Sequence, residues 1–430
     1  MSPFIAAAPI DPRPDDHLHL CWPARLIAGP GCRRSLPALL HRLGLRRGLL
    51  VTDRFFATQT GHVREQVALA AQAGITLWVY DGGLPDPSVT LCDEACDAAR
   101  AMAGAAGFDH VVALGGGSNI DLAKVLALTL PTGRRARDCV GDLAGCRPLP
   151  LVAIPTTAGT GSEATPGAIL VDPDNATKVA VMDNALRPAI AVIDPELSHS
   201  CPPRVTADAG IDAFTHAIES YLTIDSAAYD RAGHADPGYS GRSAPTMLFA
   251  RESIRLCIRW LEAAYRDGTD TDARLGMAYA SLYAGLSYGS AGLHAVHGIA
   301  YAVAGLTHAS HGTTNAVVLP YVLDALRDVR RAELLDVAAL FGLEVSRDPE
   351  RALRAVPVRV RSMVAALGLP TSLAAMGIGA ERLEALTRDA LAVTRLTKAF
   401  PAADAPRRYA AILAQAHAGR LAGDADGAGD

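Results

Sequence analysis

The chain has 430 residues, half of them hydrophobic, which is enough for a large core and, we expect, two domains. A formal net charge of −5 without a Lys/Arg block argues against nucleic acid or an anionic membrane as a partner. There is no basic segment followed by an apolar run at the N-terminus, and no apolar run of about 18 residues anywhere, so we expect neither a signal peptide nor a membrane span. The eight cysteines are scattered without a CxxC pair, which favours free thiols and a cytoplasmic location.

The first half of the chain alternates short apolar runs with amphipathic stretches. Strands are predicted over residues 47–55, 75–82, 110–118, 151–157 and 189–197, and helices over 62–74 and 88–107. This alternation predicts a mostly parallel sheet covered by helices. After about residue 198 the strand signal ends, and helical patterns continue to about residue 418. We therefore predict an α/β domain over residues 1–198 and an all-helical domain over 199–430, with a ligand site in the cleft between them.

A glycine turn follows the third predicted strand in HVVALGGGSNIDLAK. Gly115, Gly116 and Gly117 lack a Cβ and let a ligand approach the backbone, and Ser118 suits the N-cap of the next helix. The N-terminus of that helix would offer N–H groups to a diphosphate. Because GGGS is neither GxGxxG nor a Walker loop, spacing alone leaves a phosphate site and a simple tight turn both open.

Two further features point to a nucleotide. Hydroxyl groups follow an apolar strand in IPTTAGTGSEAT, where they suit a nucleotide at the carboxyl end of a sheet, although a capped polar loop would look the same. Asp53 ends the strand LLVTD, and a carboxylate there can accept a hydrogen bond from a ribose 2′-OH and repel a 2′-phosphate. Asp is also common at strand ends.

Four side chains form a candidate metal site. Asp212 and His216 lie four residues apart in AGIDAFTHAIES, on one face if the segment is helical, and His297 and His311 follow later in the chain. Three imidazoles and one carboxylate suit a divalent metal with a position left for substrate, which indicates a catalytic site. Ligand type alone suits iron or zinc.

Taken in order, the motifs GGGSNIDLAK, IPTTAGTGSEAT, GIDAFTHAIESY and HGIAY…HASHGTTNAVVLP resemble the iron-containing (group III) alcohol dehydrogenases, over about residues 25–415. The resemblance implies their two-domain, dehydroquinate synthase-like fold. It also implies a metal, Fe²⁺ or alternatively Zn²⁺, held by Asp212, His216, His297 and His311. The implied contacts to the cofactor, NAD rather than NADP, come from Asp53, Gly115, Gly116, Gly117, Ser118, Asp121, Thr156, Thr157, Thr160, Ser162 and Lys178. Asp86 stands where many members carry Asn.

One position departs from the family pattern. Many members have a further His four residues after the third ligand, often assigned to proton transfer, and here that residue is Tyr301. With a reference pKa of about 10, a tyrosine relays protons only if its surroundings lower that value. His308 and His294 are the alternatives, and for both a packing role is the other interpretation.

The activity implied is that of an NAD(H)-dependent alcohol dehydrogenase or aldehyde reductase, with a metal as Lewis acid and a small primary alcohol or aldehyde as substrate. As in relatives, we expect a homodimer or larger homo-oligomer. An anionic aldehyde (a semialdehyde or one bearing a phosphonate) is an alternative, because Arg231 and Arg242 in the loop 224–247 could bind an anion if they are not simply solvated. YSGRSAP in that loop loosely resembles the hydroxyacid–oxoacid transhydrogenases. A lyase of the dehydroquinate synthase type, a glycerol-1-phosphate dehydrogenase-like enzyme and a catalytically weak binding protein also remain open.

Overall fold

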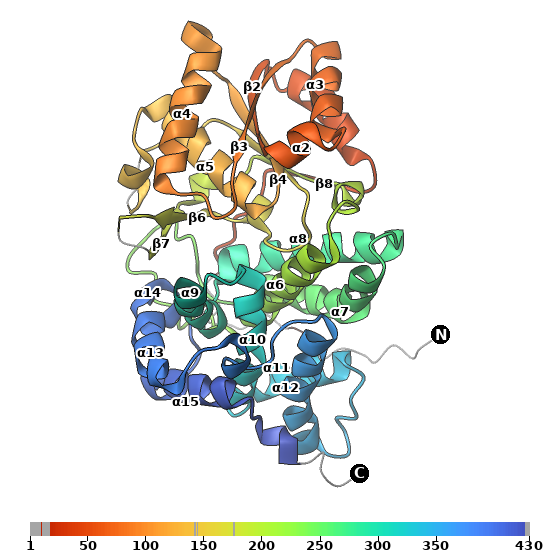
Figure 1. Ribbon diagram of the computed structural model, residues 1–430, viewed down its shortest axis with the longest axis vertical. Helices are drawn as coiled ribbons and strands as arrows, with labels where there is room; N and C mark the ends of the chain where they lie inside the picture. Colours follow the sequence, from red (N-terminus) through yellow and green to blue (C-terminus); the bar gives the residue numbers. More distant parts are fainter. Residues whose placement is uncertain (1–9, 11–17, 142, 144, 175–176, 426–430) are drawn as a thin grey trace.

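The computed structural model of the protein describes residue 10 and residues 18–141, 143, 145–174 and 177–425. Residues 1–9 and 11–17, where we expect no signal peptide, lie outside the described residues. A parallel sheet with helices on both faces forms one part of the molecule, and helices alone form the other (Figure 1). Within the described part of the chain, no helix is both long and apolar enough to cross a bilayer.

Six parallel strands form the main sheet, in the order β1-β8-β5-β4-β2-β3. They are β1 (Arg25–Ala28), β2 (Arg47–Asp53), β3 (Thr76–Gly83), β4 (His110–Gly115), β5 (Leu151–Pro155) and β8 (Ile190–Ile193). All five predicted strands are confirmed, and β1 is an addition. The order reverses between β2 and β4, since β3 lies outside β2 and β5 lies on the other side of β4. Ligands of open α/β sheets bind at such a point, beyond the carboxyl ends of the strands.

Helices α1 (Leu36–Arg42), α2 (Arg54–Thr58), α3 (His62–Gln72), α4 (Val89–Ala103) and α5 (Gly117–Thr132) cover the sheet. Strand β4 shows why both faces need cover. Val111 and Ala113 belong to the buried cluster that includes α4 and α5, whereas Val112 and Leu114 belong to the cluster on the opposite face. Because successive side chains of a strand point to opposite faces, this continuous apolar run is typical of a parallel sheet buried on both sides.

An antiparallel hairpin that the sequence did not predict lies beside the sheet. It consists of β6 (Gly167–Asp172) and β7 (Thr177–Met182). In Figure 1 the hairpin lies at the boundary between the sheet and the helical part. It therefore contributes side chains where the two parts of the molecule meet.

The helical part contains α6 (Pro203–Leu222), α7 (Ala244–Arg266), α8 (Thr271–Ala291), α9 (Ala295–Thr307), α10 (His311–Ala325), α11 (Arg331–Leu340), α12 (Pro349–Ala366), α13 (Leu383–Ala392), α14 (Thr394–Thr397) and α15 (Ala405–Ala418). The last of these ends where the sequence predicted. The predicted boundary at residue 198 falls between β8 and α6, and as a domain division it stays a prediction.

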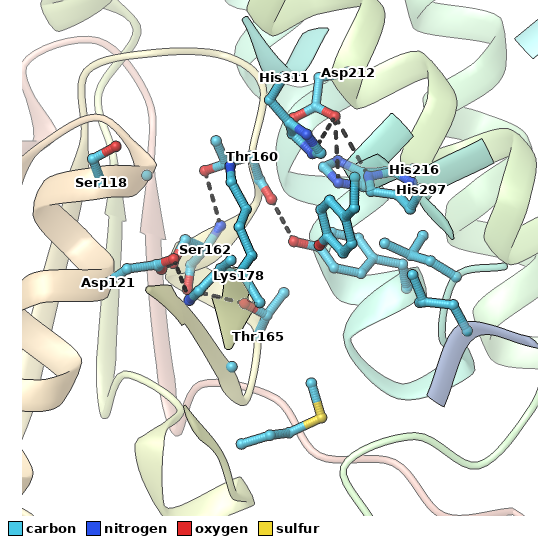
Figure 2. Close-up of a pocket in the computed structure, with 18 of the residues that line it drawn as sticks. Ser118, Asp121, Thr160, Ser162, Thr165, Lys178, Asp212, His216, His297 and His311 are labelled. Carbon is cyan, nitrogen blue, oxygen red and sulfur yellow. Dashed lines mark hydrogen bonds and ion pairs between the residues drawn. The ribbon is translucent and has the colours of Figure 1, made fainter. Parts of the chain in front are cut away.

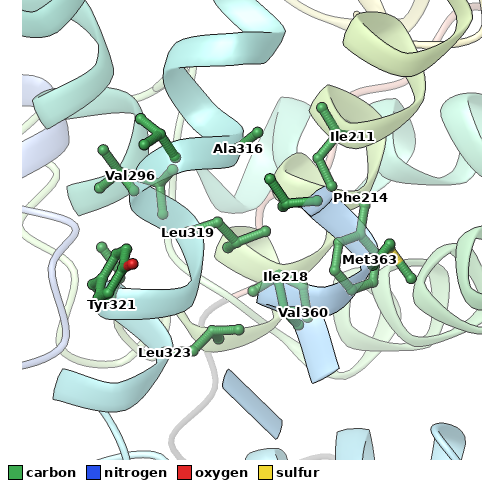
Figure 3. Close-up of a cluster of buried hydrophobic side chains, with 14 of the residues drawn as sticks. Ile211, Phe214, Ile218, Val296, Ala316, Leu319, Tyr321, Leu323, Val360 and Met363 are labelled. Atoms are coloured by element: carbon green, nitrogen blue, oxygen red, sulfur yellow. The ribbon is translucent and has the colours of Figure 1, made fainter. Parts of the chain in front are cut away.

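Helix α6 is buried on all sides from Gly210 to Leu222. Its apolar face packs Ile211, Phe214 and Ile218 into the main helical core with residues of α10 and α12, such as Leu319 and Val360 (Figure 3). Polar side chains on the rest of the buried surface need partners, because an unpaired polar group away from water is costly. These partners form the site described next.

Candidate metal and cofactor site

Four ligand side chains from three helices converge on one point. Asp212 and His216 lie one turn apart on α6, His297 lies on α9, and His311 is the first residue of α10. The Asp212 Oδ1 atom is 3.6 Å from the Nε2 atom of each of the three histidines (Figure 2). The four residues predicted from the sequence thus lie together, with their ligand atoms all within 4.8 Å of one another.

These separations fit a metal ion. With metal–ligand bonds of about 2.1 Å, two ligand atoms of a tetrahedral ion lie about 3.4 Å apart. The 3.6 Å spacing therefore leaves room for one cation between the carboxylate and the imidazoles. Nitrogen and oxygen donors of this kind suit iron(II) and zinc alike.

Glu219 holds the third ligand in place. It is fully buried, and its Oε2 accepts a hydrogen bond from His297 Nδ1 at 2.5 Å. The same carboxylate accepts from the backbone N–H groups of Val296 (2.7 Å) and His297 (3.3 Å), which are among the first of helix α9 and have no partner within the helix. Glu219 thus caps α9 and, by accepting a hydrogen bond from Nδ1–H, leaves Nε2 of His297 to face the metal position.

His216 is oriented in a similar way, with Nδ1 3.3 Å from the Gly159 carbonyl oxygen. Burial lowers the pKa of His216 to about 4 and that of His311 to about 3, so both are neutral ligands at pH 7. Burial also acts to lower the pKa of His297, but its hydrogen bonds to Asp212 and Glu219 outweigh this effect and raise it to about 10. Because a metal binds only the deprotonated imidazole, metal affinity at such a site depends on pH.

Asn315 is part of this site, although the sequence did not single it out. Its Nδ2 donates to Asp212 Oδ1 at 2.8 Å and lies 3.3 Å from Nε2 of both His297 and His311. Asn315 follows His311 by four residues on α10, so the two side chains share a face. The four-residue spacing from His311 could have identified Asn315 from the sequence.

The glycine turn begins α5, but one detail of the prediction is wrong. The N-cap is Gly116, in an extended conformation, and Ser118 lies inside the first turn. Instead of capping the helix, the Ser118 hydroxyl accepts a hydrogen bond from the Asp86 N–H at 3.2 Å. The predicted boundary was late because Gly116 already has the backbone geometry that an N-cap requires.

The glycine turn and the threonine loop lie against each other. A Cβ atom on Gly117 would come within 2.6 Å of Thr160 Cγ2, so only glycine fits there. Gly115 has φ +157°, and a Cβ on it would come within 2.2 Å of Asn119 Nδ2. No side-chain cap bonds the first N–H groups of α5, which leaves them available as an anion-binding helix N-terminus requires.

Asp53 ends β2 at the point where the strand order reverses. Its Oδ1 caps α2 by accepting from the Phe56 N–H (3.1 Å), and its Oδ2 accepts from Asn119 Nδ2 (2.7 Å). Thr156 and Thr157 follow β5 and line a separate small pocket behind the threonine loop. These three residues therefore lie around the glycine turn and not in the cavity that contains the metal ligands.

Asp121 connects the hairpin to α5, and Lys178 connects it to the loop before α4. The Asp121 carboxylate accepts from the Ser162 hydroxyl at 2.6 Å and from the Ile169 N–H of β6 at 2.9 Å. Lys178 of β7 donates to Asp86 Oδ1 at 2.8 Å.

One cavity of about 170 Å³ joins the two sets of residues. From the cofactor side it is lined by Asp86, Gly117, Ser118, Asp121, Thr160, Ser162 and Lys178. From the helical part it is lined by Asp212, His216, His297 and His311, and by Tyr239, Tyr288, Leu293, Tyr301, Arg395 and Leu396. The first turn of α5 and the metal ligands thus face the same space.

Of the three candidates for proton transfer, Tyr301 lines this cavity. Its ring stacks on His311, with centroids 5.7 Å apart and an interplanar angle of 24°. The prediction for His308 is not supported, because it is exposed, has φ +54° at the C-cap of α9 and does not line the cavity. His294 is buried, with Nδ1 3.1 Å from Glu219 Oε1, and it does not line the cavity.

The two loop arginines do not face a substrate. The loop predicted over 224–247 spans residues 223–243, because α7 already begins at Ala244, and it contains an isolated bridge from Asp225 to Arg242. Arg242 is buried in ion pairs with Asp225 (2.6 Å) and Glu333 (2.7 Å), and Arg231 donates to the Ser226 carbonyl (2.8 Å). Neither arginine lines the cavity, which does not support the alternative that they bind a substrate anion, and Arg242 is also not solvated because it is buried.

Comparison with known proteins gives the family. A family model described as iron-containing alcohol dehydrogenase matches residues 23–195, and one described as Fe-containing alcohol dehydrogenase family, C-terminal, matches residues 206–416. A long-chain-alcohol dehydrogenase of Geobacillus thermodenitrificans is 34% identical over 94% of this chain and 97% of the relative. A 4-hydroxybutyrate dehydrogenase of Cupriavidus necator is 32% identical over 93% of this chain and 97% of the relative.

The fold has the same relatives. The crystal structure of a 1,3-propanediol oxidoreductase superimposes with a TM-score of 0.83 at 28% identity, over 93% of this chain and all of the other. The matches to the family models and the curated relatives cover both the sheet and the helical part, including the glycine turn and the four metal ligands. The chain belongs to the iron-containing alcohol dehydrogenase family and is an oxidoreductase of the alcohol dehydrogenase type.

Proposed function

We propose that the protein is an NAD(H)- and metal-dependent dehydrogenase that interconverts a small primary alcohol and its aldehyde. The observation that carries this proposal is the shared cavity. Gly117 and Ser118 at the start of α5 line it together with the four metal ligands. Hydride transfer needs this proximity between cofactor and substrate.

Asp212, His216, His297 and His311 are the residues that would hold the metal. A divalent metal in such a site supplies Lewis-acid polarisation of a substrate oxygen, and nicotinamide supplies or accepts the hydride. We assign iron(II) from the family and keep zinc as the alternative, because zinc binds such ligands at least as tightly. Glu219 and Asn315 orient the ligands and so maintain the site between turnovers.

The cofactor would be held by the backbone at the start of α5. Unpaired N–H groups and the positive end of the helix dipole favour a diphosphate there. The Asp53 carboxylate accepts a hydrogen bond from Asn119 in the first turn of α5, which places it beside the glycine turn. A negative charge there disfavours the 2′-phosphate of NADP. A relative from Bacillus methanolicus, 32% identical over 86% of this chain, is named NAD-dependent methanol dehydrogenase. These observations support NAD as the cofactor.

Proton transfer is assigned to Tyr301. Tyr301 lines the cavity, its ring stacks on the metal ligand His311, and Arg395 Nη2 donates to its hydroxyl oxygen at 3.3 Å. His308, which is exposed outside the cavity, has no access to a reacting oxygen.

Aromatic and aliphatic side chains line the cavity beside the metal ligands. Tyr239, Tyr288, Leu293, Tyr301 and Leu396 would therefore lie against the substrate. Relatives are named for long-chain alcohols, methanol, lactaldehyde and 4-hydroxybutyrate, so membership of the family leaves the substrate open.

The test is a coupled assay of the metal-loaded protein. We expect aldehyde-dependent oxidation of NADH with short aldehydes, slower oxidation of NADPH, and no oxidation with the Asp212→Ala variant. Aldehyde-dependent oxidation that persists at the wild-type rate in Asp212→Ala would contradict the proposal. Conversion of a substrate without net change in NADH would instead favour a lyase of the dehydroquinate synthase type.

A further inference from the structure

A single arginine lies in the substrate half of the cavity. Around the metal ligands, the wall from the helical part consists of tyrosines and leucines, and Arg395 of α14 is the cation among them. The other lysine or arginine lining the cavity is Lys178, which pairs with Asp86 at 2.8 Å near the cofactor side.

Arg395 has a polar partner but no carboxylate. Nη2 donates to the Tyr301 hydroxyl oxygen at 3.3 Å, and the guanidinium carbon lies 5.5 Å from the centre of the Tyr301 ring. The Nε–H is buried and has no hydrogen-bond partner. Among the described residues, no carboxylate lies within ion-pair distance of Arg395.

Two fully buried arginines differ from Arg395 because each has a carboxylate partner. Arg242 pairs with Asp225 and Glu333, and Arg33 pairs with Asp194 at 2.7 Å. Arg395 is partly exposed at the cavity wall, and a guanidinium is a planar fork of donors that matches an oxyanion. Arg395 therefore has the positive charge, without a carboxylate partner, and the access to the cavity that an anionic ligand would complement.

The distance to the metal site limits the length of that ligand. Arg395 is 5.5 Å from the Tyr301 ring, and that ring is 5.7 Å from the His311 ring. One aromatic side chain thus separates the guanidinium from a metal ligand. A short molecule can place a reacting carbon at the metal ligands and an anionic group at Arg395.

We propose that Arg395 binds an oxyanion at the far end of the substrate, so that the enzyme acts on short aldehydes or alcohols that carry a carboxylate, sulfonate or phosphonate. This inference rests on the proposed function for its chemistry, but it concerns a separate part of the cavity. Arg395 acts as a specificity-determining residue, and the anion fixes the orientation of the chain that leads to the reacting carbon.

The kinetic test compares matched aldehydes. For each length, kcat/KM is measured for an anionic and a neutral aldehyde, such as succinate semialdehyde with butanal, and sulfonate- and phosphonate-bearing acetaldehydes with propanal. We expect wild type to prefer one anionic class, and Arg395→Met to reduce the anionic-to-neutral ratio of kcat/KM by about 10²-fold, as is usual for loss of one partner of a buried charge pair. General damage to the site cancels in this ratio.

Two variants control for charge and folding. Arg395→Lys keeps the charge and should retain an intermediate ratio. Lys398→Met removes a nearby positive charge from an exposed residue that donates to the Asp230 carbonyl outside the cavity, and should leave the ratio unchanged. A wild-type enzyme without preference for any anionic aldehyde, or a ratio unchanged in Arg395→Met, would overturn the inference.

Binding gives a second measurement that needs no turnover. Calorimetric titration of metal-loaded protein with butanoate should show binding to wild type, at least tenfold weaker binding to Arg395→Met, and unchanged binding to Lys398→Met. Equal binding to wild type and Arg395→Met, or none to wild type, would refute the role of Arg395. If butanoate binds through Arg395 but no aldehyde of either charge is reduced, the proposed function fails and the anion site stands.

Discussion

Glu219→Gln is the most informative change at the metal site, because it removes one charge from a residue that touches no substrate-facing surface. The carboxylate accepts four hydrogen bonds in the buried pocket, from the backbone N–H groups of His294, Val296 and His297 and from His297 Nδ1. A glutamine keeps one acceptor oxygen and replaces the other with an NH₂ group. Since each carboxylate oxygen faces two donors, either orientation of the amide places its NH₂ against N–H groups.

The magnitude follows from what His297 loses. The carboxylate makes the imidazole a better ligand and fixes the ring with Nε2 toward the metal. Loss of such an outer partner typically weakens metal binding by about 10- to 100-fold, or about 1.4 to 2.8 kcal/mol. We expect a decrease within that range for Glu219→Gln, accompanied by a loss of thermal stability because the cap of α9 is also weakened.

The assay is competition for Zn²⁺ between the protein and a chromophoric chelator at pH 7.5, with circular dichroism to confirm folding. Glu163→Gln is the matched control, because Glu163 is a buried glutamate that is not part of the metal site. Its zinc affinity should equal that of wild type. A folded Glu219→Gln variant with wild-type zinc affinity would refute the account of how His297 is positioned.

Four further variants test the remaining assignments. His297→Ala should lose bound metal and activity together, and a variant that keeps either one would contradict its role as a ligand. Asp53→Gly should raise the NADPH-to-NADH ratio of kcat/KM by about tenfold or more, since the carboxylate no longer opposes the 2′-phosphate; an unchanged ratio would remove Asp53 from cofactor selection. Tyr301→Phe should lower kcat by about 10²-fold with neutral and anionic aldehydes alike. A decrease of less than threefold would show that Tyr301 has only a packing role. Burial raises the pKa of Glu163 to about 7, so the folded protein binds this proton more tightly than the unfolded chain. The free energy of unfolding therefore falls by up to about 3 kcal/mol as the pH rises from 4.5 to 7. In urea unfolding, Glu163→Gln should therefore gain stability over wild type between pH 5 and pH 8, and a pH-independent difference would contradict the assignment.

Four of the five predicted strands (β2, β4, β5 and β8) are buried on both faces, and β3 at the edge of the sheet is partly exposed. Leu49, Leu50 and Val51 of β2 are completely buried, which gives a continuous apolar run that is readable in sequence. The strands that escaped prediction lack it. In β1 the first two residues are exposed, and in β6 buried and partly exposed residues alternate over a short segment. These strands are defined by hydrogen bonds to partner strands, and the hydrophobic periodicity of a segment does not reveal its partner strand.

At the site, the sequence revealed residues whose type and spacing carry chemistry. The metal ligands are of this kind. Glu219 and Asn315 lie within the same motifs, but their roles depend on contacts with other helices that no spacing rule contains. Arg242 and Arg395 also show that the sequence does not reveal which arginine reaches the cavity. The loop arginine is neutralised by Glu333 of α11, whereas Arg395, from a four-residue helix near the end of the chain, reaches the cavity.

The central claim is that one divalent metal, held by Asp212, His216, His297 and His311, shares a cavity with the cofactor. The most direct measurement is metal analysis of the purified protein combined with aldehyde-dependent NADH oxidation before and after chelation. We predict about one iron or zinc per chain, loss of activity with loss of metal, and recovery of both when Fe²⁺ or Zn²⁺ is returned. Full activity in chelated protein without detectable metal would contradict the account.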